Sequence, residues 1–507
     1  MKATGRCPTR AAGLLLALSL AGAGQAASLA KGIDRLLASS PGARGAFWGI
    51  QVTDLKTGKT LYQLNADRHF VPASNTKLFT TAMALVRLGP QFTFETRVTA
   101  ERAPDAEGCI RGSLRLLGGG DPNLSARAVA SQPEPARAAP APGEALAALA
   151  ELAGQVAAKG VKCVDGDIIG DDAWYVWEPY ADGWSIDDPT YEYGAAVSAI
   201  AVNDNAVTVS VSPGAREGDL AAITLTPAVQ YYAIDNRVRT VAVGAAGGEH
   251  SVHVHRAPGS LELELSGTIP LGGQGQDLAL GIQDPAKYAA LALRKLLVER
   301  GITVTGGAVA RHLLPGETSG LLAEGDAVVL ARRVSAPLVE DLRITDKASQ
   351  NLHAEMALRA VGRARGGVGS RAAGLDELRT FLTEAGIDDA AYDLEDGSGL
   401  SRPNLVTPAA VVKLLRYMYD LPARDTWISF LPVAARDGTL AGRFDDTPAA
   451  GRIHAKTGSL AHVNALSGYV QRHDGSWAAF SMLVNNSNQS AAAVRAVMDK
   501  ICILIWR

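Results

Sequence analysis

The chain has 507 residues, of which 47% are hydrophobic and 20% are charged, and its formal net charge is −3. This length allows about three domains. The small negative charge gives no support for a nucleic-acid partner, which would bind through a strongly basic surface.

The first 26 residues have the pattern of an export signal. Basic residues precede an apolar run at 11–23, and the small residues Gly24 and Ala26 fit cleavage after Ala26. The apolar run is short for a membrane span, so we expect at most peripheral membrane association, with an uncleaved anchor as the alternative. Cleavage would remove three basic and no acidic residues, changing the net charge from −3 to −6. The expected location is the periplasm.

The next segment alternates between strand and helix patterns. A short helical stretch is followed by an apolar strand at 46–52, a turn at 54–59 and a strand at 60–64, which predict a hairpin. An apolar helix then starts near Ser74 and ends near residue 88. From residue 92 to about 282, short strands dominate, with one helix at 144–158 and a proline-rich loop at 131–143.

Helical patterns return at residue 284, with one helix around 352–362. Two strands at 463–471 and 477–484 are joined by an Asp-Gly turn and precede a last helix from about residue 489. Because the two ends have the same character, we expect one discontinuous domain in which the first hairpin and the last strands share an antiparallel sheet packed by helices. The expected boundaries are 1–26 for the signal, 27–90 and 283–507 for this domain, and 91–197 and 198–282 for two inserted domains.

Three cysteines follow the predicted cleavage site. Cys109 and Cys163 both begin a Cys-x-x-Gly-polar-apolar pattern. If these are neighbouring strands in matched register, a disulfide between them is geometrically reasonable, and export permits it. Two buried free thiols are the alternative. Cys502 lies in an apolar tail and is expected in the core.

The chemistry-bearing motifs begin with Ser74 and Lys77. The two residues are one helical turn apart, so the hydroxyl and the amine can meet on one face. A serine becomes a good nucleophile when a neighbouring base takes its proton, and an uncharged lysine can do so. Ser-Gln-Asn at 349–351 and Lys-Thr-Gly-Ser at 456–459 follow in the C-terminal part.

Each of these motifs is weak when it stands alone, because short patterns recur by chance. Ser28 begins a second Ser-x-x-Lys at the start of a helix, and residues 56–58 spell Lys-Thr-Gly in a tight turn. Their order and context separate the functional copies from these two.

In this order, the motifs resemble the three elements of penicillin-binding proteins and related serine acyl-transfer enzymes. More narrowly, the sequence resembles the penicillin-binding protein 4 group of D-alanyl-D-alanine carboxypeptidases and endopeptidases, peptidase family S13, at residues 71–77, 118–122 and 396–402. The 275 residues from Ser74 to Ser349 exceed the spacing in small class A β-lactamases. Gln350, where Asp also occurs, and His454, where Arg is common, depart from the pattern and are expected to tune rate or specificity.

The resemblance implies an α/β (α+β) fold, namely a serine β-lactamase/transpeptidase-like domain with a large β-rich insertion. It implies Ser74 as nucleophile, Lys77 as base and Ser349 as proton relay, with no metal or cofactor. Burial and the charge of Lys456 would lower the pKa of Lys77. The implied substrate-binding residues are Asn351 for the substrate amide, Lys456 and Thr457 for its carboxylate, Gly458 for close approach, and Ser459, whose N–H would join that of Ser74 in an oxyanion hole.

The function implied is a serine-type D-Ala-D-Ala carboxypeptidase and/or D,D-endopeptidase that acts on peptidoglycan peptides and is acylated by β-lactams. A β-lactamase or esterase of the same fold and a non-catalytic wall-binding protein are the alternatives. The intact motifs argue against the second alternative, and the long insertion argues against the first. A histidine group at 250–255 lacks the Cys or carboxylate partners of a metal site. The balance of the two peptidase activities, the role of the insertion and the oligomeric state stay open.

Overall fold

The structure is a computed structural model that describes residues 27–124, 144–244, 251–317 and 327–507. The expected signal segment, the loop at 131–143 and His250 lie outside these residues. The chain divides into two units. Unit 1 contains the described residues up to Asn75 together with Leu382–Asp393 and Asn404–Arg507, and unit 2 contains Thr76–Phe381 and Leu394–Pro403. Among the described residues, no helix has both the length and the apolar character that a membrane crossing requires.

Unit 1 is built on an antiparallel sheet in the order β2-β1-β22-β21-β20. Its strands are β1 (Phe47–Asp54), β2 (Thr60–Leu64), β20 (Ile453–Leu460), β21 (Val463–Gln471) and β22 (Trp477–Asn485). The central pairing joins the two ends of the chain, with Ile50 opposite Met482. The predicted sharing of one sheet by the first hairpin and the last strands is therefore confirmed.

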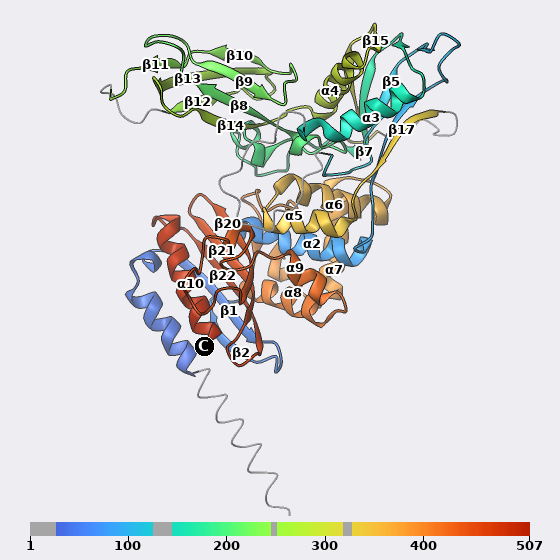
Figure 1. Ribbon diagram of the computed structural model, residues 1–507. Helices are drawn as coiled ribbons and strands as arrows, with labels where there is room; N and C mark the ends of the chain where they lie inside the picture. The colour runs from blue at the N-terminus through green and yellow to red at the C-terminus, as the bar shows by residue number, and fades with distance from the viewer. Residues whose placement is uncertain (1–26, 125–143, 245–250, 318–326) are drawn as a thin grey trace, which may run out of the picture. The chain divides into compact units, whose positions relative to one another are not determined.

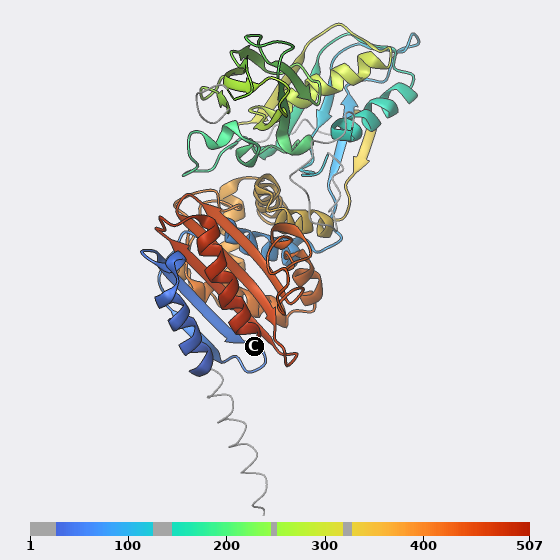
Figure 2. The ribbon, with the colours of Figure 1, turned by 60° about the vertical axis from the view of Figure 1, so that its left-hand side comes forward.

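Helices cover both faces of this sheet. Unit 1 contains η1 (Pro41–Ala43), α8 (Pro408–Asp420), α9 (Arg424–Phe430), α10 (Ala491–Trp506) and the short pair β18 (Tyr392–Asp393) and β19 (Leu405–Val406). Alternate residues of β1, such as Ile50, belong to the core that α10 completes, and Figure 2 shows α10 lying across the sheet. Gly49 points the other way, where an added Cβ would lie 2.8 Å from Pro408 of α8. The strand thus alternates between two buried faces.

In unit 2, three helices pack together next to the predicted motifs. They are α2 (Lys77–Leu88), α5 (Leu338–Lys347) and α6 (Asn351–Gly366), and α7 (Arg371–Glu384) follows along the chain. All residues of α2 from Lys77 to Leu85 are buried, so this helix is a core element on every side. It ends where predicted, at Gly89 with φ of 80°, a conformation that glycine adopts without steric cost.

The rest of unit 2 is rich in strands (Figure 1). A mixed sheet in the order β16-β7-β5-β3-β17 is packed by helices α3 and α4. Its elements are β3 (Glu95–Ala100), β5 (Leu114–Leu117), α3 (Ala147–Ala158), β7 (Ile168–Val176), α4 (Pro285–Glu299), β16 (Ala308–Leu313) and β17 (Val328–Val334). The strands β16 and β17 lie beyond residue 282 along the chain. The proposed domain boundaries stay a prediction.

Two smaller sheets account for the strand-rich segment around residues 206–281. One consists of β8 (Ala206–Ser212), β9 (Ala222–Thr226) and β14 (Gln276–Gly281). The other consists of β10 (Ala233–Asn236), β11 (Arg239–Val241), β12 (Val252–His255) and β13 (Glu262–Pro270). His253 and His255 both lie on β12, and His253 is hydrogen-bonded to Ser251.

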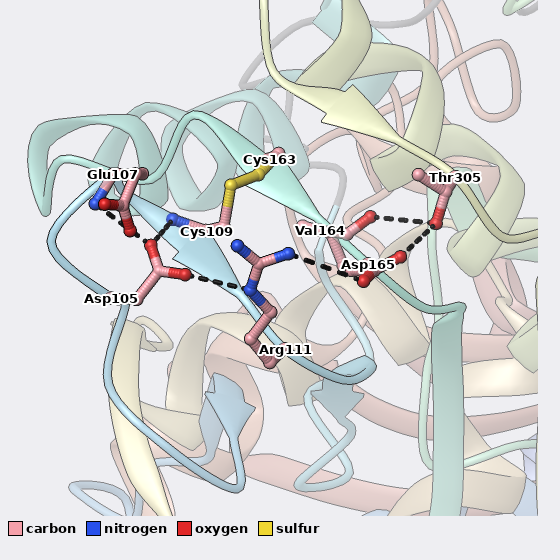
Figure 3. The surroundings of a disulfide bond; sticks show 8 residues. All are labelled: Asp105, Glu107, Cys109, Arg111, Cys163, Val164, Asp165 and Thr305. Carbon is pink, nitrogen blue, oxygen red and sulfur yellow. Dashed lines mark hydrogen bonds and ion pairs between the residues drawn. A yellow bond between two sulfur atoms is a disulfide. The ribbon is translucent and has the colours of Figure 1, made fainter.

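A disulfide joins Cys109 and Cys163, as Figure 3 shows. They lie opposite each other on the parallel strands β4 (Cys109–Ile110) and β6 (Cys163–Val164), with a Cα–Cα distance of 4.6 Å. The third strand of this small sheet is β15 (Thr303–Val304). The sequence left a disulfide and two buried free thiols open as alternatives, and the structure has the matched register and the disulfide. Cys502 is a buried free thiol in α10, as expected.

Candidate active site

Ser74 lies in η2 (Ala73–Thr76), a single 3-10 turn that continues directly into α2. The preceding Ala73 has a left-handed φ of 48°, which costs a residue with a Cβ about 1–2 kcal/mol. The segment before the turn is tied to β22, because Asn485 accepts from the Val71 N–H at 2.8 Å and donates to the Val71 carbonyl at 3.1 Å. This amide pair holds the serine segment against the sheet of unit 1.

The edge strand β20 passes beside the same turn. Asn75 donates through Nδ2 to the Lys456 carbonyl at 3.0 Å. A Cβ added to Gly458 would lie 2.8 Å from the Pro72 carbonyl oxygen and 3.1 Å from the Ser74 nitrogen. Only glycine therefore allows β20 this close to the serine. The expectation that Gly458 permits close approach of the strand agrees with this geometry.

The Lys-Thr-Gly-Ser motif lies on β20 itself, whereas the sequence pattern placed it just before a strand. Lys456 is fully buried, and its Nζ donates to the Thr457 carbonyl at 3.0 Å. The Thr457 hydroxyl donates to that of Thr439 at 2.7 Å, and Ser459 accepts from Arg495 at 2.9 Å. Thr439 and Arg495 could not be identified from the sequence, because neither belongs to a recognisable local pattern.

In unit 2, Lys77 is completely buried at the start of α2. Its Nζ donates to Asn351 Oδ1 at 2.6 Å and to the Ser398 carbonyl at 2.7 Å. One turn later, the Thr81 hydroxyl lies 2.7 Å from the Lys77 carbonyl and 3.0 Å from Asp346 Oδ2. The first and second predicted motifs are thus in direct contact through Lys77 and Asn351.

The second motif forms the beginning of α6. Ser349 has a left-handed φ of 60°, and Gln350 caps the helix by accepting from the Leu352 N–H at 3.1 Å. Asn351 donates through Nδ2 to the Tyr193 carbonyl at 2.8 Å. Both ends of the Asn351 amide are therefore oriented, one by Lys77 and the other by the insertion.

Residues 396–401 form a tightly bonded loop, here called the Asp396 loop. Asp396 accepts from the backbone N–H groups of Gly399 and Ser401, both at 2.7 Å. It also accepts from Trp184 Nε1 at 3.0 Å. The carboxylate at the centre of the loop fixes its shape, which agrees with the part of the family pattern noted at 396–402.

Glu355 of α6 accepts hydrogen bonds from this loop, and it was not identified from the sequence. Its Oε1 accepts from the N–H groups of Gly397 and Ser398 at 2.9 and 2.8 Å. Burial and the nearby charge of Asp396 raise the pKa of Glu355. Since the Ser398 carbonyl accepts from Lys77, Glu355 positions an acceptor of the lysine amine. The only indication of this role in the sequence is that Glu355 lies about one helical turn after the Ser-x-Asn motif.

The turn at 56–58 behaves differently from the later Lys-Thr-Gly copy. Thr57 donates to Asp54 through both its N–H and its hydroxyl at 2.7 Å, closing the hairpin between β1 and β2. This agrees with its interpretation as a turn. The roles of the eight predicted site residues stay predictions, although the structure places Ser74 beside β20, and Lys77 beside Asn351.

Comparison with known proteins gives consistent results. The family model described as D-Ala-D-Ala carboxypeptidase 3 (S13) family matches residues 29–504. A D-alanyl-D-alanine carboxypeptidase of Actinomadura sp. (strain R39) is 37% identical over 96% of this chain and 88% of its own length. The crystal structure of penicillin binding protein 4 from Haemophilus influenzae has a TM-score of 0.77 at 24% identity, covering 94% of this chain and 99% of that one.

A second structure of the Haemophilus protein, complexed with a novel β-lactam, has a TM-score of 0.71 at 23% identity and covers 94% of this chain and 98% of that one. These likenesses confirm the predicted fold class, an α/β (α+β) serine β-lactamase/transpeptidase-like fold with a large β-rich insertion. With the family model matching almost the whole chain, this protein belongs to the D-Ala-D-Ala carboxypeptidase 3 (S13) family.

Proposed function

We propose that this protein is a serine-type D-Ala-D-Ala carboxypeptidase and/or D,D-endopeptidase that acts on peptidoglycan peptides through an acyl-enzyme on Ser74. The observation that carries the proposal is the buried amine of Lys77, held by Asn351 and Ser398 one helical turn after Ser74. A buried amine with two fixed acceptors is suited to act on a neighbouring hydroxyl rather than to interact with solvent.

Lys77 is the base in this mechanism. A neutral amine has two N–H groups and one lone pair, and the two N–H groups match the acceptors Asn351 Oδ1 and Ser398 O. The lone pair then takes the proton of the Ser74 hydroxyl as the serine oxygen attacks the carbonyl of the D-Ala-D-Ala bond. Ser349, at the beginning of α6, relays this proton to the leaving amine, because a hydroxyl both donates and accepts.

The substrate lies along β20. An edge strand can bind an extended peptide through its backbone groups, and β20 is the edge of the sheet in unit 1. Lys456 and Thr457 bind the terminal carboxylate, and Asn351 binds the substrate amide. The backbone N–H groups of Ser74 and Ser459 stabilise the oxyanion, each by about 3 kcal/mol. The close packing of Gly458 against Ser74 supports this arrangement.

The location of the protein and its acylation by β-lactams are proposed from the sequence. The predicted signal, with cleavage after Ala26, directs the protein to the periplasm, where its substrate is found. β-Lactams resemble the D-Ala-D-Ala terminus chemically and acylate the same serine. The structure of the Haemophilus relative in complex with a β-lactam supports this proposal, because that protein has the same fold.

Labelled penicillin tests the proposal directly. We expect a stable covalent adduct on Ser74, detected by intact-mass analysis and peptide mapping, and its loss in Ser74→Ala but not in the matched Ser28→Ala control. Rapid release of penicilloate without a lasting adduct would replace the proposal by the β-lactamase alternative. Absence of any adduct on the folded protein would leave the non-catalytic wall-binding alternative. Digestion of purified cross-linked muropeptides then separates carboxypeptidase from endopeptidase products.

A further inference from the structure

The insertion contacts the Ser-x-Asn motif at two points. Gln350 Nε2 donates to Asp204 Oδ2 at 2.7 Å, and Asn351 Nδ2 donates to the Tyr193 carbonyl at 2.8 Å. Tyr193 lies in η5 (Glu192–Gly194) and Asp204 in η6 (Asn203–Asn205), two short turns of the strand-rich part of unit 2. The middle and last residues of the motif are therefore held by side-chain bonds to the insertion.

His353, less than one turn further along α6, reinforces the same attachment. Its Nδ1 lies 2.7 Å from Asp341 Oδ1 and its Nε2 lies 3.4 Å from Asp204 Oδ1. The ring is fully buried. Burial opposes a charge on His353, but the carboxylates of Asp341 and Asp204 outweigh it and raise its pKa to about 9. At neutral pH, a cationic ring thus joins α5, α6 and η6.

The backbone around Asp204 is strained and strongly held. Asn203, Asp204 and Asn205 all have left-handed φ values, of 52°, 54° and 50°. Asn203 donates to the Ala206 carbonyl at 2.9 Å, and Asn205 donates to the Ala196 carbonyl at 3.0 Å. Three consecutive residues of this kind persist only where the surroundings enforce them, and such strain clusters at functional positions.

The glycine-rich segment at 118–122 carries a further buried carboxylate of unit 2. This is Asp121, which is 2% exposed. Burial raises the pKa of Asp121 to about 6, against the Asn123 N–H that it accepts, and the charges of Asp341 and His353 also act on it. This part of the family pattern has no place in the acyl-transfer mechanism itself. Its carboxylate interacts electrostatically with Asp341 and His353 of the cluster.

We propose that Asp204 is a positioning residue, which holds Gln350 and, together with His353, sets the orientation of Ser349 and Asn351 for acyl transfer. This inference rests on the proposed function, because it explains how Ser349 and Asn351 are held in the geometry that acyl transfer requires. The insertion then forms part of the catalytic apparatus. Gln350 matters because its amide can donate to Asp204, whereas a carboxylate at this position would face a second carboxylate.

A double-mutant cycle between Gln350 and Asp204 tests this proposal. Gln350→Glu places two carboxylates together, and we expect the rate constant of penicillin acylation at saturation to fall about 10- to 100-fold, the loss typical of a reacting group displaced by about 1 Å. Adding Asp204→Asn restores a donor–acceptor pair and is expected to recover most of the rate. Gln350→Ala, which removes the bond without adding charge, gives a second measurement if Gln350→Glu does not fold.

The chain offers a matched control pair in His312 and Asp172. Here too a histidine Nδ1 lies 2.8 Å from a buried carboxylate, and the pKa of His312 is raised to about 9. These residues lie on β16 and β7, and not on the helices α5 and α6 or the turn η6 that His353 joins. Asp172→Asn is expected to lower the melting temperature and to leave the acylation rate unchanged.

Three results would overturn the proposal. They are wild-type acylation in Gln350→Glu or Gln350→Ala, failure of Asp204→Asn to rescue Gln350→Glu, and an equal loss of rate in Asp172→Asn. Any of these could occur while the wild-type protein still forms its adduct on Ser74. Absence of the adduct in the wild type would instead refute the proposed function.

Discussion

Replacement of Glu355 by alanine is expected to release the loop that holds the amine of Lys77. The Glu355 carboxylate accepts from the N–H groups of Gly397 and Ser398. The carbonyls of the same two residues accept from Thr80 at 2.7 Å and from Lys77 at 2.7 Å. A single buried side chain therefore connects α6 to α2 through the Asp396 loop.

The size of the effect follows from the bonds that are lost. Two buried N–H groups lose their acceptor, at about 1–3 kcal/mol each. Arg359, 3.1 Å from Glu355 Oε2, loses its charged partner, which costs about 3–5 kcal/mol for a buried pair. Arg359 keeps its bonds to the carbonyls of Glu355 and Glu178, so the lower end of each range applies. We expect a loss of about 5 kcal/mol in the free energy of unfolding.

Glu355→Gln separates the two contributions. The glutamine carbonyl can still accept from both N–H groups, while the ion pair is lost, so we expect a loss of only about 3 kcal/mol. Urea unfolding gives both values. Penicillin acylation of the folded protein is expected to fall about 100-fold in Glu355→Ala and much less in Glu355→Gln.

Glu151, which pairs with Arg333 and is half exposed, provides the control for this experiment. An exposed ion pair contributes less than about 1 kcal/mol, so Glu151→Ala is expected to change neither quantity appreciably. The reasoning would be refuted by a folded Glu355→Ala variant with wild-type acylation, because Lys77 would then be held without the Asp396 loop.

Gly458→Ala is expected to slow acylation about 100-fold and to lower the free energy of unfolding by about 1–3 kcal/mol, because the added Cβ would press on the backbone at Ser74. An unchanged time course of penicillin acylation would contradict the close packing. Replacing Cys109 and Cys163 by serine frees a loop of 54 residues and is expected to cost up to about 4 kcal/mol, measured as the denaturation midpoint with and without reductant. The raised pKa of His353, about 9 against 6.5, contributes about 3 kcal/mol that is fully present below pH 6.5 and is lost as the pH rises through 9. Unfolding curves across this pH range should show a smaller decline in the free energy of unfolding for His353→Gln than for the wild type. An identical decline in both proteins would exclude His353 as the source of the pH dependence.

Much of the fold could be predicted because its signals are local. The strands Thr60–Leu64 and Val463–Gln471 lie where alternation and turn residues placed them. The shared pattern at Cys109 and Cys163 made a disulfide one of two alternatives, and the choice between them needed the register of β4 and β6. The three motifs were found by their order along the chain.

The support of the site could not be predicted in this way. Asn75 contacts Lys456 across 381 residues, and Gln350 contacts Asp204 across 146 residues. Neither contact leaves a periodic or spaced pattern in the sequence, since each depends on how distant segments pack. Glu355 resembles any charged helix residue until its burial is known.

The pairing of β1 with β22 has a consequence for how the protein acquires activity. The central pairing of the sheet, in which Ile50 lies opposite Met482, can form only after the last part of the chain has been synthesised. The strand β20 belongs to the same late part. Closing so long a loop is entropically costly and makes such a topology slow to fold. We therefore expect the turn that carries Ser74 to become ordered last, so that incomplete chains ending before β20 are unable to react with penicillin.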